Sequence, residues 1–232
     1  MTVTDMKNKP ARRKRRKQAD RREESRERIL DAAEELFAKR GFHGVSVREI
    51  ADASGADTSL LHYYFGAKAA LFETVIERRA ALVNDSRLAS LEAYERDNAN
   101  AMTAAGIIRA YLEPTFKFMM AGDPGYLNYG ALIARINSSP PGEGPDMSAS
   151  PFDGVVQKLI GLLKTVRPEC SEAELYWFYH LMSGAITLSL AQTGRIDFLS
   201  GGACRSDDFE AILQHMVQVF GHGLGGLVGN KV

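Results

Sequence analysis

The sequence predicts an all-α protein of about nine helices. Apolar residues recur three and four positions apart from about residue 24 to residue 220, which is the spacing of a buried helix face. Glycines, prolines and capping residues divide this pattern into segments of helix length. No run of alternating β-branched residues indicates a strand, and no internal repeat is present.

The composition is that of a globular protein with a substantial core. The chain has 232 residues, of which 45% are hydrophobic, enough for one large domain or two smaller ones. No apolar run reaches the ~18 residues of a membrane helix, and no apolar stretch of a signal peptide follows the basic N-terminal segment. The two cysteines and five histidines show no metal-binding spacing. We therefore expect a cytoplasmic protein with reduced thiols, no membrane partner, no metal and no cofactor.

The first 22 residues form a basic block. They contain ten Lys and Arg residues against two Asp, a net charge of +8, and the rest of the chain carries a net charge of −8. Because blocks of like charge are typically disordered, we expect a disordered basic arm over residues 1–23. One interpretation is a solvated tail without a partner. The other is an arm that binds nucleic-acid phosphates, for which the candidates are Arg12, Arg13, Arg15 and Arg16.

The first helix is expected from about residue 24 to residue 40. Its buried face has five apolar members at helical spacing: Ile29, Ala32, Ala33, Leu36 and Phe37. Gly41 follows where a left-handed residue would end the helix. Lys39 and Arg40 precede it and favour the negative end of the helix dipole.

Residues 46–68 predict two short helices around a tight turn. Ser46 and Glu49 match a capping box at the start of the second helix, and Gly55 supplies the turn. Asp57 is a favourable N-cap for the third helix. This is the outline of a helix-turn-helix, whose second helix can lie in the major groove of DNA.

The third helix has one buried face and one exposed face. Leu61, Tyr64 and Phe65 share the buried face. Hydroxyl and imidazole groups occupy most of the other positions. A hydroxyl can bond to several bases and a leucine can contact a thymine methyl, so the candidates for base contacts are Thr58, Ser59, Leu60 and His62.

A long helix begins near Ala67, and the rest of the chain is also expected to be helical. The approximate ranges are 104–121, 125–137, 151–166, 171–193 and 206–220. Prolines and glycines between residues 138 and 151 predict a loop, and a second loop is expected over 194–206.

The stretch ILDAAEELFAKRGFHGVSVREIADASGADTSLLHYYFGAKAALFETV resembles the N-terminal domain of the TetR family of transcriptional repressors. The resemblance rests on A-A-x-x-L-F in the first helix, G-[FY]-x-x-x-[ST]-[VT]-R-x-I-A before and within the second, and L-x-x-Y-F-x-x-K-x-x-L-F thereafter. Residues 174–202 resemble, more weakly, a subgroup that includes fatty-acid-responsive regulators. The resemblance implies a helix-turn-helix DNA-binding domain over 24–80 and a helical ligand-binding and dimerisation domain over 81–232.

For four residues the resemblance implies contacts with DNA phosphates: Ser46, Arg48, Tyr63 and Lys68. Ser46 and Lys68 lie at predicted helix starts, where free N–H groups favour an anion. Residues 23–80 carry eight basic and eleven acidic side chains, so this domain is net acidic. We therefore hypothesise that the basic arm supplies much of the affinity for DNA.

Large apolar and aromatic side chains are frequent between residues 104 and 193. Ordinary core packing explains most of them, and a ligand site would use a subset as its walls. The candidates are Phe116, Met119, Met120, Tyr126, Tyr129, Trp177 and His180. Few positive charges lie in this region, so an apolar or weakly acidic ligand fits better than a polyphosphate.

The resemblance also implies a homodimer formed by the helices at 171–193 and 206–220. Small residues would allow close approach and apolar residues would form the contact: Ser183, Gly184, Phe209, Leu213, Met216, Val217 and Phe220. A twofold dimer places two recognition helices about one DNA turn apart, ~34–36 Å, which predicts a pseudo-palindromic operator.

The leading interpretation is a ligand-responsive transcriptional repressor that binds operator DNA as a homodimer and is released by a small effector. The alternative is a constitutive DNA-binding protein without an effector. A cavity lined by residues 104–193 would favour the first interpretation, and a filled core the second. An enzyme is not expected, because no catalytic constellation such as G-x-S-x-G is found.

Overall fold

The computed structural model describes residues 9–140 and 151–226, with side chains over 20–140 and 151–224. All regular structure in these residues is helical, in ten helices, which confirms the all-α prediction. The chain divides into two compact units, residues 1–75 and 76–232, whereas the sequence places the boundary after residue 80. None of the described helices combines the length and apolar character of a membrane span.

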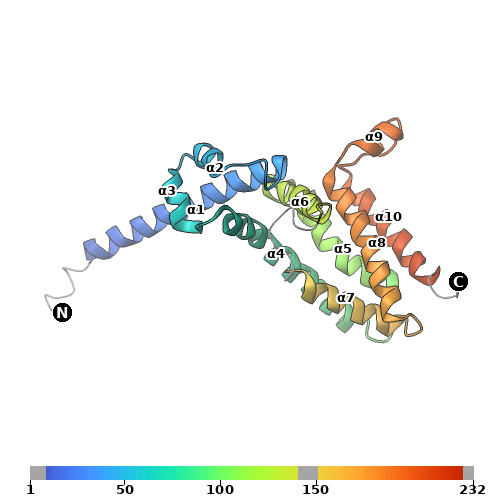
Figure 1. Cartoon of the computed structure of the whole chain (residues 1–232). Helices are drawn as coiled ribbons and strands as arrows, with labels where there is room; N and C mark the ends of the chain where they lie inside the picture. The colour runs from blue at the N-terminus through green and yellow to red at the C-terminus, as the bar shows by residue number, and fades with distance from the viewer. Residues whose placement is uncertain (1–8, 141–150, 227–232) are drawn as a thin grey trace, which may run out of the picture. The chain divides into compact units, whose positions relative to one another are not determined.

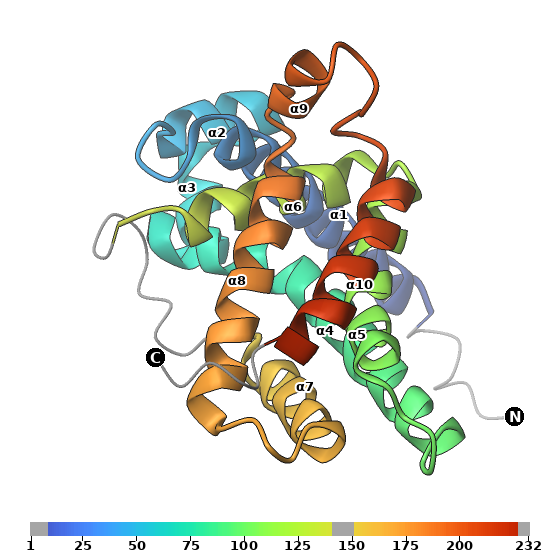
Figure 2. The same ribbon diagram turned by 90° about the vertical axis from the view of Figure 1, so that its right-hand side faces the viewer.

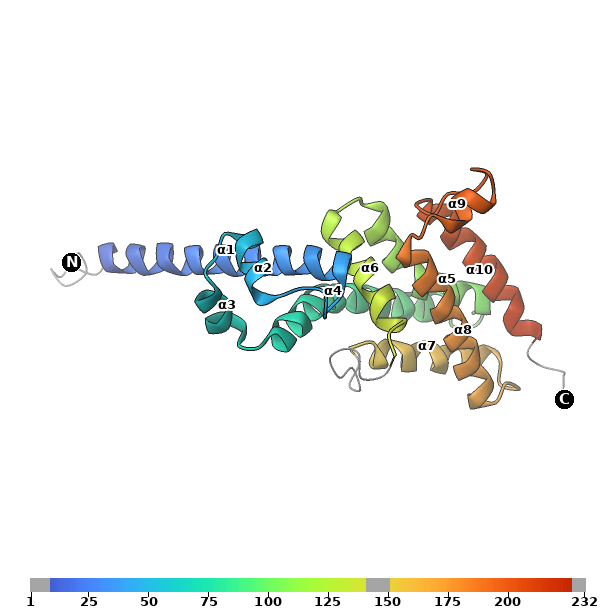
Figure 3. The same cartoon turned by 45° about the horizontal axis from the view of Figure 1, so that its top comes forward.

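The first unit consists of three helices and the start of a fourth (Figure 1). They are α1 (Lys9–Arg40), α2 (Val47–Ser54), α3 (Thr58–Phe65) and the first turns of α4 (Lys68–Asp97). Figure 3 shows α1 in its full length, with α2 and α3 beside its middle section. Apolar side chains from these helices and the loop before α2 form the core: Ile29, Leu30, Ala33, Phe37, Val45, Ile50, Leu61, Leu71 and Phe72.

Helix α1 is longer than the sequence predicts. It begins at Lys9, whereas the charge pattern predicts a disordered arm up to residue 23. Pro10 lies in the first turn, where a missing N–H breaks no helical hydrogen bond. The remainder contains no glycine and is rich in Lys, Arg, Glu and Ala, which are favourable helix formers. These propensities account for the helical backbone of the basic segment from Lys9 onward.

Apart from the start of α1, the helices of the first unit begin and end close to where the sequence predicts. Gly41 and Gly55 have φ angles of 71° and 64°, in the left-handed region that favours glycine. The hydroxyl of Ser46 accepts from the backbone N–H of Glu49, and the Glu49 carboxylate accepts from the N–H of Ser46 at 2.8 Å. The capping box is therefore confirmed, and it determines where α2 starts.

The second unit contains the rest of α4 and six further helices (Figure 2). Their bounds are α5 (Ala104–Met120), α6 (Pro124–Asn137), α7 (Asp153–Val166), α8 (Glu172–Ala191), α9 (Arg195–Leu199) and α10 (Phe209–Gly226). Helix α10 packs along α5, α8 packs along α6, and α7 contacts both α5 and α8. In Figure 2, α8 and α10 run side by side and face the viewer.

The apolar face of α10 is buried within the single chain. Four of the dimer-interface candidates lie on it with their side chains at most 8% exposed: Phe209, Leu213, Met216 and Val217. Phe209 contacts Phe116 of α5 at a ring-centroid distance of 6.2 Å. A fifth candidate, Phe220, meets Phe178 of α8 edge to face at 5.7 Å. These side chains belong to the core of the unit, because α5 and α8 supply the apolar partners that the sequence assigns to a second chain.

Two glycines permit close contacts in this unit. A Cβ at Gly106 would overlap the phenol ring of Tyr94, whose hydroxyl accepts from the backbone N–H of Thr103 at 3.1 Å. A Cβ at Gly221 would lie 2.8 Å from the Cβ of Ala105. The packing of α4, α5 and α10 near these positions therefore depends on the absence of a side chain.

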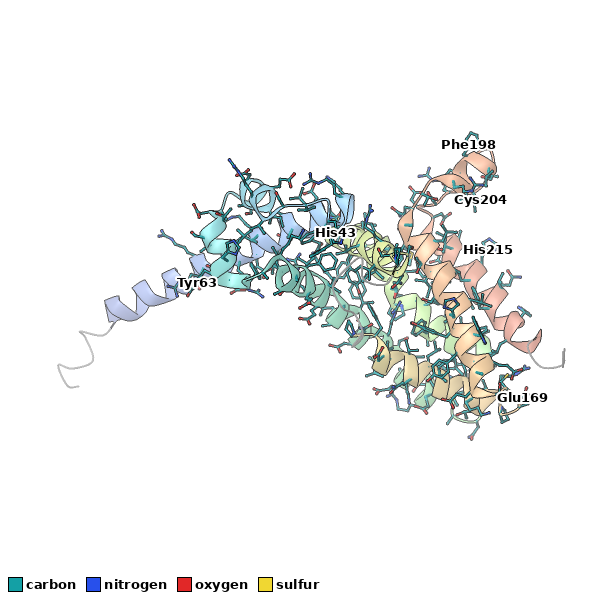
Figure 4. The ribbon with its side chains drawn as sticks, viewed as in Figure 1. His43, Tyr63, Glu169, Phe198, Cys204 and His215 are labelled. Atoms are coloured by element: carbon teal, nitrogen blue, oxygen red, sulfur yellow. The ribbon has the colours of Figure 1, made fainter. Side chains whose placement is uncertain are left out.

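Helix α9 lies in the segment 194–206 that the sequence predicts as a loop. Its five residues are too few to show a helical period. The helix lies beyond the ends of α8 and α10 (Figures 1 and 2), and its apolar side chains are exposed: Ile196, Phe198 and Leu199. Figure 4 shows Phe198 and Cys204 in this outlying part. The Cys204 thiol is exposed, whereas Cys170 is buried.

Candidate nucleic-acid interface and ligand cavity

Helix α3 is held by its ends and by one buried leucine. The Asp57 carboxylate accepts from the backbone N–H of Ser59 at 2.7 Å and caps the N-terminus. Leu61 is 2% exposed and anchors the middle, and Gly66 ends the helix with a φ of 70°. One face of the helix is therefore fixed in the core, and the opposite face is free to meet another molecule.

The exposed face of α3 carries most of the residues predicted to contact DNA. Thr58, Ser59 and His62 are exposed, and Tyr63 is 71% exposed. Figure 4 shows Tyr63 on this helix. Leu60 is half-buried. The structure thus brings together the hydroxyl, imidazole and phenol groups of this short helix on one surface.

The other two aromatic residues of α3 are turned toward α1. The Tyr64 hydroxyl donates to the backbone carbonyl of Arg22 at 3.2 Å. The guanidinium of Arg26 lies over the ring of Phe65, 5.7 Å from its centroid. Both rings are half-buried and help to position α3 against α1.

Ser46, Arg48 and Lys68 differ in how free they are to contact phosphate. Arg48 is exposed. The Ser46 hydroxyl is already engaged by Glu49. The Lys68 ammonium donates to the carbonyls of Phe42 and Val45, at 2.9 and 3.0 Å, and leaves one N–H for an external acceptor. Lys68 therefore also has a structural role, because it ties the loop before α2 to the start of α4.

Glu49 is a charged neighbour of this surface. Hydrogen bonds from the hydroxyl of Ser46 and from Arg40, together with the N–H of Ser46, lower the pKa of the Glu49 carboxyl to about 2. The Arg40 Nη1 atom lies 2.7 Å from the carboxylate. Arg40 is thus paired within the unit, which reduces the positive charge available to DNA.

The predicted arm residues Arg12, Arg13, Arg15 and Arg16 lie on the backbone of α1. Their side chains fall outside the described residues. Their place in a helix sets the spacing of the charges, since residues three and four apart share a face.

A cavity of about 350 Å³ lies in the second unit, among α4, α5, α6, α7 and α8. Its lining comes from all five helices and the residue before α7: Val83, Arg87, Tyr111, Thr115, Tyr129, Ile133, Asn137, Phe152, Asp153, Val156, Gln157, Tyr176, Tyr179, Ser183, Ile186 and Leu190. Apolar walls with a few polar groups are typical of small-molecule sites.

Two tyrosine hydroxyls in the cavity have raised pKa values. Burial is the main cause for Tyr129, whose pKa rises although the charge of Arg87 lowers it. Burial and the nearby Tyr111 raise the pKa of Tyr179 to about 12, against a lowering by the hydrogen bond with Ser183. Both hydroxyls are therefore neutral near pH 7, and each keeps a proton that it can donate.

Of the seven residues predicted to line a ligand site, Tyr129 lines this cavity. Phe116, Met119 and Tyr126 are buried in the core, and Met120 is exposed. Trp177 and His180 lie edge to face on the exposed side of α8, with Trp177 66% exposed. The prediction recognised large side chains but not the direction in which each one points.

The exposed side of α8 forms an apolar surface. Trp177, Leu181 and Leu188 are each more than 60% exposed and recur at helical spacing, and Gly184 lies between them. Ser183, predicted with Gly184 in the dimer interface, instead lines the cavity. We call the set Trp177, Leu181 and Leu188 the α8 surface.

The described residues contain no cluster of three or more potential metal ligands among His, Cys, Asp and Glu.

Two family models match the chain. Residues 29–75 match bacterial regulatory proteins of the tetR family, and residues 109–223 match a tetracyclin repressor-like C-terminal domain. The HTH-type transcriptional regulator RutR of Escherichia coli K12 is 36% identical over 85 residues. That match covers 37% of this chain and 38% of RutR, so the chain spans less than two-fifths of this relative's length.

Two solved structures share the fold. HlyIIR, a hemolysin II transcriptional regulator, has a TM-score of 0.57 at 20% identity, with 84% of this chain and 97% of that chain covered. The regulator FadR from Bacillus subtilis, crystallised with stearoyl-CoA, has a TM-score of 0.53 at 15% identity with the same coverage. At these identities the likeness establishes the fold.

Proposed function

The chain belongs to the TetR family of bacterial regulatory proteins, and we propose that it is a ligand-responsive transcriptional repressor. It binds a pseudo-palindromic operator in double-stranded DNA as a homodimer. A small apolar or weakly acidic effector binds in the second unit and releases the protein from DNA.

The exposed face of α3 is the observation that carries the DNA-binding part of this proposal. Thr58, Ser59 and His62 present short polar groups at the start and middle of the helix, where a recognition helix reaches base edges. Tyr63 supports a phosphate contact beside them. No Lys or Arg lies on α3, so sequence readout is shared with the shape of the DNA.

The basic segment at the start of α1 supports a separate source of affinity. Phosphate neutralisation by Lys and Arg supplies most of the sequence-independent affinity of DNA-binding proteins. Residues 23–80 are net acidic, and Arg40 is paired with Glu49. We therefore assign the phosphate-binding charge mainly to residues 1–22, as a helical rather than a disordered segment from Lys9 onward.

The α8 surface supports the homodimer. Clustered exposed apolar side chains on a soluble domain mark an interaction site, and burial of aromatic and leucine side chains stabilises homodimers. Gly184, which lies between the residues of the α8 surface, has no side chain and allows two helices to approach closely. The contact is thus proposed on the outer side of α8 instead of the buried face of α10.

The cavity favours the ligand-responsive interpretation over the constitutive one. Most of its lining residues fall within 104–193, where a protein that only dimerises would have a filled core. The long helix α4 contributes Val83 and Arg87 to the cavity wall and begins at Lys68. An effector that moves α4 can therefore alter the start of the same helix, and coupling of this kind is often worth about 1–3 kcal/mol.

A footprint on DNA upstream of the protein's own gene tests this function. We expect protection of a twofold-related site, and a reporter under that site should fall when the protein is expressed. Ser59→Ala and His62→Ala should each weaken specific binding by about 1–3 kcal/mol. Glu35→Gln, an exposed change on α1, is the matched control. Equal affinity for operator and unrelated DNA, or a reporter that rises with the protein, would contradict the proposal.

A further inference from the structure

Arg87 is a buried arginine without a carboxylate partner among the described residues. Its side chain lies on α4 and is 6% exposed. Its Nε atom donates to the hydroxyl of Thr115 at 2.7 Å, and its guanidinium lies 4.6 Å from the ring centroid of Tyr111. Four of its five N–H donors are therefore left for another acceptor.

A buried cation in such surroundings is costly. Burial of a charge without a counter-charge is strongly unfavourable, and a hydroxyl and an aromatic ring offset only part of that cost. Natural proteins pair or hydrogen-bond such groups, and an unpaired one indicates a missing partner. Because Arg87 lines the cavity, the partner can come from there.

Tyr129 supplies a second unsatisfied donor at the same cavity. Its side chain is 3% exposed, and its hydroxyl has no hydrogen-bond partner within the described part of the chain. It lies on α6, whereas Arg87 lies on α4, and the charge of Arg87 is near enough to affect the pKa of Tyr129. Two side chains with free donors, from different helices, thus line the same cavity.

The polar lining residues of the cavity fall into a buried set and an exposed set. Arg87, Tyr111, Thr115 and Tyr129 are the buried lining residues that carry polar groups. The exposed members of the lining are Asn137, Asp153, Gln157 and Tyr176. Asp153 is the acidic member of the lining, and it lies in the first turn of α7, where the helix dipole stabilises its charge. It is exposed, and among the described residues it forms no ion pair with Arg87.

We propose that this cavity binds a compact organic monocarboxylate, with the carboxylate at Arg87 and Tyr129 and an apolar body along the walls. This inference rests on the proposed function, since it names the chemical class of the effector. The guanidinium matches the two oxygens of a carboxylate, and the tyrosine hydroxyl donates a further hydrogen bond. The apolar body contacts Val83, Ile133, Ile186 and Leu190.

The same features argue against other ligand classes. A cationic ligand would be repelled by Arg87, and a neutral one would leave the guanidinium unpaired. A coenzyme A thioester has several phosphate charges, whereas Arg87 is the one cation among the described lining residues. A volume of about 350 Å³ is also at the small end for ligand pockets, which extend to roughly 1,000 Å³. The ligand class therefore differs from the stearoyl-CoA found with FadR.

Calorimetric titration of the full-length protein, without DNA, tests the proposal. The probes are straight-chain acids from butanoate to dodecanoate, together with phenylacetate and 3-phenylpropanoate. Each acid is paired with the alcohol of the same carbon skeleton, and octylamine and octanoyl-CoA complete the set. We expect at least one acid to bind roughly 10- to 100-fold more tightly than its alcohol, as for a hydrogen-bonded charge.

Two variants locate the effect. Arg87→Met removes the charge but keeps an unbranched side chain, and it should abolish the preference for the acid while leaving the affinity for the alcohol within about twofold. Tyr129→Phe removes one hydroxyl and should weaken acid binding severalfold. Arg96→Met, an exposed arginine on the same helix, is the matched control and should bind like the wild type.

Three results would overturn the proposal. They are equal affinity for every acid and its alcohol, a retained acid preference in Arg87→Met, and binding of octanoyl-CoA without binding of any free acid. If Arg87→Met does not fold, the proposal is still tested by the affinities of the wild type for each acid and its alcohol, and by the acid affinity of Tyr129→Phe. DNA binding of the empty protein is measured separately. A neutral compound that releases DNA would refute the carboxylate class alone, whereas failure to bind DNA would refute the proposed function alone.

Discussion

The outer faces of α3 and α8 present opposite chemistry. Helix α3 exposes hydroxyl, imidazole and phenol groups, whereas α8 exposes tryptophan and leucine side chains. A polar face is stable when exposed to water, so the contacts that it makes can form and break reversibly. Burial of an apolar face of several large side chains against a partner is favourable, because it removes apolar surface from water. From this difference we expect a reversible contact at α3 and a lasting contact at α8.

The largest expected effect is on self-association. Leu181→Asp places a charge in the middle of the α8 surface, and burying it against a partner is strongly unfavourable. We expect the dimer dissociation constant to rise by about 100-fold or more, measured by analytical ultracentrifugation. Leu82→Asp is the matched control, because Leu82 is an exposed leucine on α4. A dimer that survives Leu181→Asp would show that α8 is not the contact.

The next effect concerns the polar side of the comparison. Deletion of residues 1–19 removes eight basic side chains and one acidic one, while keeping Arg22, whose carbonyl accepts from Tyr64. DNA affinity should fall roughly 10- to 100-fold at 0.1 M salt, and the salt slope should flatten by about 0.9 for each phosphate that the shortened protein no longer neutralises. Fluorescence anisotropy over a salt series measures both. An unchanged slope would mean that the basic segment does not bind phosphate.

A third test examines packing within the second unit through a pair of glycines. Gly106→Ala would force the ring of Tyr94 to move, and we expect a decrease of about 1–3 kcal/mol in the free energy of unfolding. Gly161→Ala, in the exposed part of α7, meets no atom within 4 Å and should gain about 0.5–1 kcal/mol. Urea denaturation gives both values. If the free energy of unfolding changed in the same direction in both variants, the packing of Tyr94 on Gly106 would be contradicted.

The smallest effects come from a feature that both units share. Ser46 with Glu49 caps α2, and Ser171 with Glu174 caps α8, each as a complete capping box. Ser46→Ala and Ser171→Ala should each lower the stability of the helix that they cap by about 1 kcal/mol. Amide hydrogen exchange at the first turn of each helix measures the effect locally. The two motifs are alike. A difference between the two losses of protection against exchange would therefore report how strongly the rest of each unit stabilises the first turn of its helix.

The capping boxes also predict a pH dependence. Hydrogen bonds from Ser46 and from Arg40 together lower the Glu49 pKa from its ordinary 4.5 to about 2, and those from Ser171 lower the pKa of Glu174. A lowered pKa in the folded state stabilises the protein above the unfolded value, and this stabilisation disappears as the pH falls. The penalty of Ser46→Ala should therefore be full above about pH 4.5 and shrink toward pH 2. A penalty independent of pH would refute the link to Glu49.

Local signals explain why much of the first unit could be predicted. Gly41, Gly55 and the Ser46–Glu49 pair act through backbone geometry and short hydrogen bonds, which depend on residues next to them in the chain. The exposed face of α3 followed from helical spacing alone. The start of α1 could not be predicted in this way. A block of like charge favours a solvated arm, whereas the Lys, Arg and Ala residues of the same block favour a helix.

The second unit depends on contacts between distant segments. Arg87 gave no signal, since a single arginine on an amphipathic helix is usually solvated, and its burial arises only when α5, α6 and α8 surround it. Trp177 and His180 were assigned to a ligand site because α8 is apolar on nearly all sides, which hides its orientation. The inner face of α10 was assigned to a partner chain from the family resemblance, and the sequence alone does not show that α5 covers this face.

The two cysteines make the protein a ready-made subject for spectroscopy. Cys204 is exposed in the loop after α9, and Cys170 is fully buried, so a thiol reagent will modify one site in each folded chain. A spin label or fluorophore can be attached there without any substitution. In an assembly of two chains, the separation between the two labels would then report on the geometry around α9 with and without a bound carboxylate.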